Sequence, residues 1–342
     1  MARTTPATPT EERCVTSYPA RRGYAPGVLY PPEAPNVTDA IDIHCHAHGG
    51  QQDALALARF ASVSGMRGLL FKTITDFARP ADAVARIQDA LDDWAEAEED
   101  IRPIECWAGA LMGFDGSAPT RRWCEEQIES GAIALWLPVF NHANTYAKVG
   151  GREIWWNPDA DPSAHSDPLP WEEALAKGHY LLEEDGRLKN EIADIVRLCA
   201  ERGVALFFGH ATHAEIDRLA ELVAALGFDR AVVDHPFSPF VDLEIDYMKR
   251  LAAAGITLNF TYDELSPLLG VDPARMYEAI REVGPEHCTL SSDAGEPLFP
   301  NSVECIRLIR GYMEAFGLDA DEIRTVSTLN PARIVGLETV TQ

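Results

Sequence analysis

The 342-residue sequence predicts a (β/α)8 barrel, a ring of eight parallel strands surrounded by helices. Two observations support this fold class. Eight short runs are apolar on both faces, as the buried strands of a parallel sheet are, and an amphipathic helical segment follows each run. Parallel strands need crossover helices, and eight such units close into a barrel. A doubly wound open sheet is the alternative, but no glycine fingerprint for a dinucleotide follows any of the eight runs.

The expected elements alternate along the chain. The strands are expected at residues 40–46, 67–73, 102–111, 132–140, 204–210, 230–236, 256–260 and 288–293. The helices are expected at residues 53–65, 80–100, 118–131, 190–203, 214–227, 242–255, 272–284 and 302–317. Several helical segments end in glycine, which is a common helix terminator, and the next strand then begins at once.

Two segments do not fit this alternation. Residues 1–38 are rich in proline and small polar residues, so we interpret them as an N-terminal extended arm that precedes a barrel over residues 39–342. Residues 138–189 form a long connection after the fourth strand, which predicts a lid over the carboxyl face of the barrel. Its aromatic residues, among them Tyr146 and Trp155, favour an ordered lid, because disordered segments are poor in aromatics.

Composition narrows the function classes. The formal net charge of −25 argues against binding to nucleic acid or to an anionic membrane, because both need a basic surface. No apolar run approaches the roughly 18 residues that span a bilayer. The seven cysteines include no CxxC pair, and the first residues contain no apolar signal region. We therefore expect a cytoplasmic protein whose cysteines are reduced.

Titratable side chains stand at the ends of several expected strands. His44 and His46 end the first strand, and residues two apart on a strand point to the same face, so the two imidazoles make half of a metal site. On its own this spacing is weak evidence. Other apolar runs end in Lys72, His210, His235 and Asp293. A hydrogen-bonded core histidine or a solvated strand end explains any one of these, but the carboxyl ends of all barrel strands meet at one rim. The set therefore predicts a shared metal site.

These motifs resemble the amidohydrolase superfamily of metal-dependent hydrolases over about residues 40–337. In that superfamily HxH ends strand one, histidines end strands five and six, and an aspartate ends strand eight. The segments SSDAGEPLFP and NPAR are similar to its strand-eight segment and C-terminal helix, and GMRGLLFK resembles a poorly characterised branch with a lysine after strand two. The metal ligands that the resemblance implies are His44, His46, Lys72, His210, His235 and Asp293. It also implies one or two divalent ions, zinc or alternatively manganese, and hydrolysis of an amide, ester, lactone or C–N bond.

Lys72 departs from the best-known two-metal members of the superfamily, where a carbamylated lysine on strand four bridges the metals. The fourth expected strand here, AIALWLPVF, contains no lysine. Three roles for Lys72 stay open: a carbamylated bridge between metals, a cation that binds a substrate carboxylate or polarises a carbonyl, and a surface residue just past the strand. In the first two cases Lys72 is buried, and a buried ammonium needs a partner.

The catalytic residues that we expect are Asp293, His235 and Lys72. Asp293 would take a proton from metal-activated water and pass it to the leaving group, and His235 would polarise the substrate carbonyl or carry a proton. Lid residues expected to contact substrate are His142, Tyr146, Lys148, Arg152 and Trp155. Together they suit a small aromatic or carboxylated molecule.

Three function classes stay open at this point. The first is a metal-dependent hydrolase of a small molecule. The second is a one-metal decarboxylase or hydratase, which belongs to the lyase class. The third is a non-catalytic metal-binding barrel. The N-terminal arm is compatible with a homodimer, since arms of this kind pack on neighbouring subunits.

Overall fold

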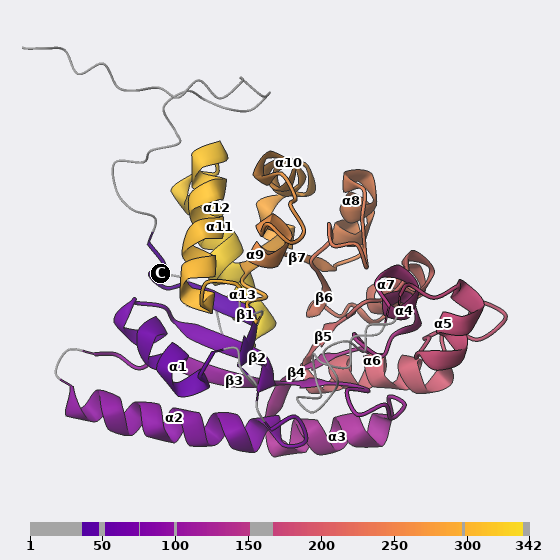
Figure 1. Cartoon of the computed structure of the whole chain (residues 1–342), viewed down its shortest axis with the longest axis horizontal. Coiled ribbons are helices and arrows are strands. Elements are labelled where there is room, and N and C mark those ends of the chain that lie inside the picture. Colours follow the sequence, from indigo (N-terminus) through magenta and orange to yellow (C-terminus); the bar gives the residue numbers. More distant parts are fainter. Residues whose placement is uncertain are drawn as a thin grey trace, which may run out of the picture.

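The computed structural model describes residues 36–47, 52–74, 76–98, 101–150, 167–295 and 298–337. Eight parallel strands alternate with helices around a ring (Figure 1), which confirms the (β/α)8 barrel. The strands are β1 (Ile41–Ala47), β2 (Gly68–Ile74), β3 (Glu105–Leu111), β4 (Ala132–Trp136), β5 (Ala205–Phe207), β6 (Ala231–Asp234), β7 (Thr257–Thr261) and β8 (Cys288–Ser291). Each strand pairs with the next in the order β1 to β8.

Eight longer helices cover the outside of the ring, and each follows one of the strands. They are α1 (Ala54–Val63), α2 (Pro80–Ala97), α3 (Arg121–Ser130), α6 (Asn190–Arg202), α7 (His213–Leu226), α8 (Ile245–Ala253), α10 (Pro273–Val283) and α11 (Ser302–Phe316). Shorter helical elements are α4 (Ala143–Lys148), α5 (Trp171–Lys177), α9 (Tyr262–Leu265), η2 (Pro285–His287), α12 (Ala320–Arg324), the π-helical turn η3 (Thr325–Leu329) and α13 (Asn330–Ile334). Figure 1 shows α2 and α3 along one side of the ring and α8, α10 and α11 along the opposite side.

The ring closes between its first and last strands through a short seam. Cys45 of β1 forms a single parallel bridge with Ala294, just beyond β8. The Asp293 backbone N–H donates to the His44 carbonyl at 2.8 Å, and the His46 N–H donates to the Ala294 carbonyl at 3.1 Å. Three titratable residues of the expected metal site therefore lie on the segments that close the barrel.

Strands β5 and β6 are shorter than the sequence predicts. The backbone turns after β5 at Gly209, which has a φ of +58°. A Cβ atom at this position would come within 2.5 Å of the Leu137 carbonyl oxygen, so only glycine fits there. After β6 the turn falls at His235, with a φ of +33°. His210 and His235 consequently stand on turns at the rim rather than within strands.

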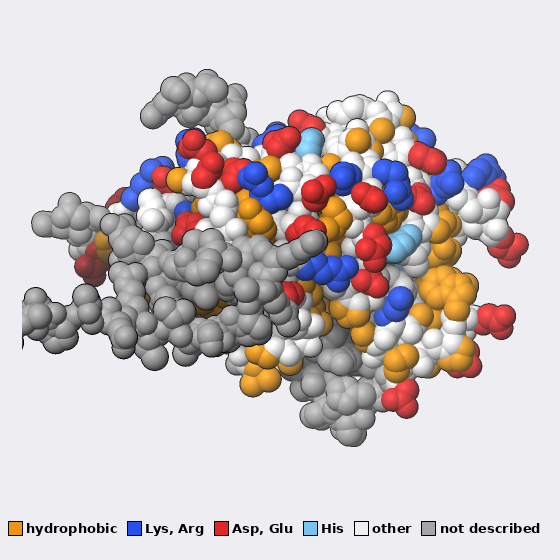
Figure 2. All heavy atoms as spheres, turned by 90° about the horizontal axis from the view of Figure 1, so that it is seen from above, with side chains coloured by type: hydrophobic (Ala, Val, Ile, Leu, Met, Phe, Trp, Pro, Cys, Tyr) orange, Lys and Arg blue, Asp and Glu red, His pale blue; other side chains and the backbone are white. Residues whose placement is uncertain are grey.

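The core has an inner and an outer layer. Side chains such as Ile41, Leu70, Phe207 and Val232 fill the barrel interior, where they pack with Ile334 of α13. Larger apolar clusters lie between the strands and the surrounding helices. On the face drawn in Figure 2, acidic and basic side chains are interspersed over the described surface. Among the described residues, no helix combines the length and the apolar character needed to cross a membrane.

The described parts of the insertion over residues 138–189 contain α4 and α5 and are tied to the barrel by a buried hydrogen bond from His142 to Glu215. His142 Nε2 lies 3.1 Å from Glu215 Oε1, and both side chains are fully buried. Glu215 also accepts hydrogen bonds from the backbone N–H groups of Leu181 and Thr212. Burial alone would raise the pKa of Glu215, but His142 and these hydrogen bonds lower it below its ordinary value of 4.5. Glu215 thus anchors the insertion to α7.

Replacing Glu215 by Gln should lower the free energy of unfolding by about 1.5–3 kcal/mol at pH 7, because hydrogen bonds to a buried charge are lost. The native pKa lies below the unfolded value, so this stabilisation is present above pH 4.5 and is lost as the pH falls through the native pKa. Urea unfolding at pH 7 and at about pH 4 measures the difference. The control is Glu221→Gln on the same helix, whose side chain is 62% exposed and whose effect should stay within about 0.5 kcal/mol. A loss for Glu215→Gln that does not shrink in acid contradicts the assignment.

Candidate active site

Three potential metal ligands converge at the seam of the barrel. His44 Nε2 lies 3.0 Å from Asp293 Oδ1, and His46 Nε2 lies 2.9 Å from the same oxygen. One ligand atom from each residue falls within 4.8 Å of the other two. Asp293 has a φ of +47°, a conformation that is uncommon for a residue with a side chain and that is often found at functional sites. These three residues form the candidate metal group.

The donor atoms of this group fit a divalent cation. His44 Nε2 is buried, and its contact with Asp293 Oδ1 at 3.0 Å is too poorly aligned to be a good hydrogen bond. A cation bound between the imidazole and the carboxylate would satisfy both groups. Two imidazoles and a carboxylate are a usual ligand set for zinc. The residues present therefore match the metal that the sequence implies.

His44 is held in one tautomer by a buried carboxylate that the sequence analysis missed. The Asp234 side chain, at the end of β6, accepts three hydrogen bonds inside the barrel. The donors are His44 Nδ1 at 3.0 Å, Asn259 Nδ2 at 2.8 Å and Trp136 Nε1 at 2.8 Å. Because a carboxylate only accepts, His44 Nδ1 carries a proton, and Nε2 is the ring nitrogen that is directed at Asp293 and is available to a metal ion.

Burial and neighbouring charges shift the pKa values of the three residues in the candidate metal group. Burial alone would lower the pKa of His44, but the carboxylates of Asp234 and Asp293 outweigh it and raise that pKa to about 9. Burial lowers the pKa of His46 to about 3. For Asp293, burial is outweighed by the charge of His44 and the hydrogen bond from His46, and the pKa lies well below its usual range. A metal ion bound in the group would replace the proton on His44 Nε2. It would then supply the positive charge beside the carboxylates of Asp234 and Asp293.

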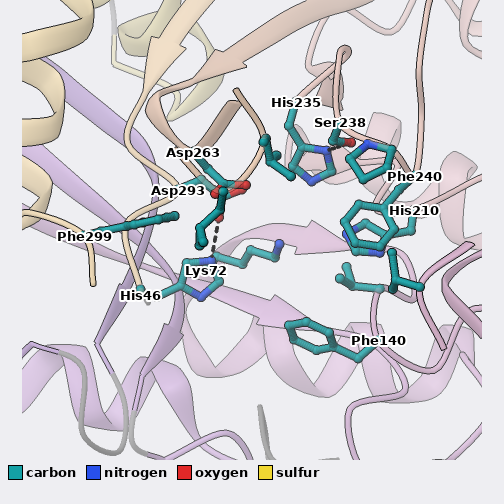
Figure 3. Close-up of a pocket in the computed structure, with 16 residues that line it drawn as sticks. His46, Lys72, Phe140, His210, His235, Ser238, Phe240, Asp263, Asp293 and Phe299 are labelled. Atoms are coloured by element: carbon teal, nitrogen blue, oxygen red, sulfur yellow. Dashed lines mark hydrogen bonds and ion pairs between the residues drawn. The ribbon is translucent and has the colours of Figure 1, made fainter. Parts of the chain in front are cut away.

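A cavity of about 310 Å³ opens beside this group (Figure 3). Its polar wall includes His46 and Asp293, with Lys72 extending across it toward His210. Three phenylalanines, Phe140, Phe240 and Phe299, surround the polar groups on the outer sides. Lys72 is only 3% exposed and lies within β2, which excludes the surface role left open by the sequence.

His210 presents a lone pair to the cavity. The Thr145 hydroxyl donates its proton to the Val139 carbonyl, so it accepts from His210 Nδ1, which lies 2.8 Å away. Burial holds the pKa of His210 well below its usual range, so the ring is neutral and Nε2 is an acceptor. The ring stacks on Phe240 with centroids 3.8 Å apart. His210 is therefore held rigidly at the cavity wall.

His235 faces His210 across 5.3 Å between ring centroids. Its Nδ1 is 2.8 Å from the Ser238 hydroxyl, and burial lowers its pKa to about 4. Neither His210 nor His235 belongs to the three-ligand group. Both line the same cavity as Lys72, His46 and Asp293, and the ring centroid of His44 lies 6.1 Å from that of His235. The structure thus brings together all six residues that the sequence placed at the rim.

The lid residues expected to contact substrate are placed differently. His142 is buried against Glu215, and Tyr146 packs under the ammonium of Lys177 at 4.8 Å. Neither of them, nor Lys148, is among the described residues that line the cavity, where the insertion contributes Val139, Phe140 and Val149 instead. The other two expected residues, Arg152 and Trp155, lie outside the described residues.

The side chains that orient the site escaped the sequence analysis. Trp136 lies inside the barrel, where it donates to Asp234 and stacks on Phe207 with centroids 4.0 Å apart. Asn259 has no motif around it. One feature of the sequence could have indicated this network: Asp234 stands at the end of the apolar run AVVDHP, and a carboxylate buried there needs a buried hydrogen-bond donor.

Replacing Asp234 by Asn should raise the Kd for Zn²⁺ by about 10–100-fold, the usual loss when the hydrogen-bond partner of a ligating histidine is altered. Competition with a chromogenic chelator measures this. Asp246→Asn, at a side chain that is 91% exposed on α8, is the matched control and should leave the affinity unchanged. Unchanged affinity in a folded Asp234→Asn protein would show that the carboxylate does not orient His44.

Several solved structures share this fold. A Pseudomonas aeruginosa amidohydrolase is 12% identical, with a TM-score of 0.51 over 87% of this chain and 95% of its own. The probable dipeptidase PvdM from the same organism is 13% identical, with a TM-score of 0.54 over 87% and 94%. An Agrobacterium tumefaciens protein solved in its apo form is 11% identical, with a TM-score of 0.53 over 89% and 97%. At these identities the likeness is one of fold, and it agrees with the barrel of the superfamily that the motifs resemble.

A comparison with curated protein sequences gave no significant match. The family comparison did: residues 39–259, from the start of β1 into β7, match the model of a family of unknown function, DUF6282. That range is well over half of the chain and includes His44, His46 and Lys72. The protein therefore belongs to the DUF6282 family.

Proposed function

We propose that this protein is a metal-dependent hydrolase that acts on a small molecule. The observation that carries the proposal is the convergence of His44, His46 and Asp293, whose ligand atoms all lie within 4.8 Å of one another. The group opens into a cavity at the carboxyl ends of the strands, where barrel enzymes have their active sites. Shared fold with an amidohydrolase and a probable dipeptidase supports hydrolysis as the reaction class.

In this proposal His44, His46 and Asp293 hold one divalent cation, zinc or manganese. When bound, the cation supplies Lewis acidity and lowers the pKa of water at the site. Asp293 Oδ1 contacts both histidines, which leaves Oδ2 without a hydrogen-bond or ion-pair partner among the described residues. That oxygen is free to take a proton from the attacking water and return it to the leaving group.

His210 and His235 then supply complementary polar groups. His210 Nε2 accepts hydrogen bonds, because its Nδ1 proton is held by Thr145. His235 Nε2 becomes a donor when its Nδ1 accepts from the Ser238 hydroxyl, and it would then polarise a substrate carbonyl. Its neutral ring suits this role, because burial lowers the pKa of His235 to about 4.

A one-metal lyase, a decarboxylase or hydratase, is the second candidate. The described residues form a single three-ligand group, and neither His210 nor His235 is part of it. Two metals bridged by a carbamylated Lys72 would instead favour hydrolysis. A single bound metal is compatible with both reactions, so the products of turnover distinguish them.

The proposal predicts that protein purified without chelator contains about one equivalent of a divalent metal and cleaves amides, esters or lactones from a panel of small molecules. Removing the metal should abolish turnover, and adding it back should restore it. In water enriched in ¹⁸O, a hydrolase places the label in a carboxylic acid product and a hydratase places it in a new hydroxyl group, whereas a decarboxylase releases CO₂ and adds no water oxygen to its organic product.

Asp293→Asn should lower kcat by about 10²–10⁴-fold, because the variant cannot take the proton. Asp246→Asn, which is exposed on α8, should retain full activity. Full turnover by a metal-loaded Asp293→Asn protein would refute the role of Asp293, and absence of metal in every preparation would refute the proposed function.

A further inference from the structure

We infer that the substrate is a compact monocarboxylate with an apolar, ring-sized body, and that the Lys72 ammonium binds its carboxylate. This inference rests on the proposed function, because it assigns the substrate class of the same cavity. It follows from three features of the described cavity: a buried cation without a protein partner, an apolar wall and a balance of charge that accepts one negative group.

Among the buried acidic and basic side chains of the described residues, histidines aside, Lys72 differs in having no hydrogen-bond or ion-pair partner. The others, apart from histidines, each make hydrogen bonds: Asp42, Glu215, Asp234, Glu264 and Arg310. Lys72 makes no hydrogen bond and no ion pair within 4 Å to any described residue. Its charge does lower the pKa of Asp293 and of Asp234 from a greater distance.

An ammonium in this position is costly unless an anion meets it. Burying an unpaired charge destabilises a protein by several kcal/mol, so such groups are rare outside functional sites. An apolar side chain of the same length would fill this position without that cost. The Lys72 side chain extends into the cavity with the ammonium toward the centre, as Figure 3 shows. The geometry therefore points to a ligand anion as its partner.

The apolar lining and the volume of the cavity indicate what the remainder of that ligand is like. Half of the described lining residues are apolar: Val139, Phe140, Val149, Pro239, Phe240, Leu268, Leu269 and Phe299. A volume of about 310 Å³ is at the small end of the range of roughly 300–1,000 Å³ for ligand pockets, which favours a compact molecule. The flat faces of Phe140, Phe240 and Phe299 suit an aromatic or alicyclic ring.

The charge balance favours a single carboxylate over a phosphate. Lys72 is the one lysine or arginine among the described lining residues, whereas Asp263 and Asp293 contribute two carboxylates. His210 is neutral and offers a lone pair on Nε2, so it repels an anion rather than holding one. Together with the divalent cation of the proposed function, Lys72, Asp263 and Asp293 leave one net positive charge, which a single carboxylate neutralises and a dianion exceeds.

Benzoate and benzamide test this inference, because they share a shape and differ in charge. Titration calorimetry on the full-length, zinc-loaded protein should show benzoate binding at least tenfold more tightly than benzamide. In Lys72→Met, the Kd for benzoate should rise at least tenfold while the Kd for benzamide stays the same. Lys72→Arg keeps the charge and should keep the preference. Lys249→Met, at a lysine 42% exposed on α8, is the matched control and should bind both as wild type does.

Other outcomes overturn the inference. Equal affinity of wild type for benzoate and benzamide does so without any variant, even if Lys72→Met fails to fold. Unchanged benzoate binding in a folded Lys72→Met protein shows that the metal holds the carboxylate. Loss of metal from Lys72→Met, measured by mass spectrometry of the metal content, identifies Lys72 as a carbamylated ligand instead. A preference for benzoate that depends on Lys72 in a protein that never binds metal supports the anion site while refuting the proposed hydrolase.

Discussion

The carboxylate of Asp234 is the group on which the candidate site depends. It is fully buried inside the barrel and joins four strands, because it extends from β6 and accepts hydrogen bonds from His44 on β1, Trp136 on β4 and Asn259 on β7. Burial alone would raise its pKa, but His44 lowers the pKa to about 2, so the group stays charged. A charge buried this deeply is tolerated only when its hydrogen bonds are complete. One of these hydrogen bonds holds His44 Nδ1, which directs the other ring nitrogen, Nε2, toward Asp293.

The same network continues to the other side of the seam. Asn259 donates to Asp234 and accepts from the hydroxyls of Thr289 and Ser291 on β8, two residues before Asp293. The positions of both halves of the ligand group, on β1 and after β8, are thus linked through the barrel interior. This linkage supports the uncommon backbone conformations of His235 and Asp293, since positive φ values persist where surrounding contacts determine them. Hydrogen bonds to the barrel strands therefore help to position site residues that themselves lie just beyond the strand ends.

Much of this could be predicted from the sequence, and the reasons for the rest are physical. Apolar runs identify the barrel strands, and the period of two in a strand places His44 beside His46. Both features could be predicted because they depend only on residues that are close together in the sequence. The partner of His44 is not local: Asp234 lies 190 residues away, and only closure of the ring brings the two together. The contacts of the insertion were not predictable for a related reason. His142 precedes a short helix that turns it toward Glu215, and an isolated stretch of sequence does not reveal which side a six-residue helix will bury.

The acidity of the chain does not conflict with an anionic substrate. On the face drawn in Figure 2 acidic and basic side chains are interspersed, and at physiological ionic strength the Debye length is about 8 Å. Exposed charges beyond that distance contribute little at the cavity, whereas buried charges are screened much less. Lys72 is one of only five lysines in the chain, and it is the one that the fold places in the cavity wall without a partner among the described residues. Local charge at the cavity, rather than the net charge of the protein, decides which substrate can enter.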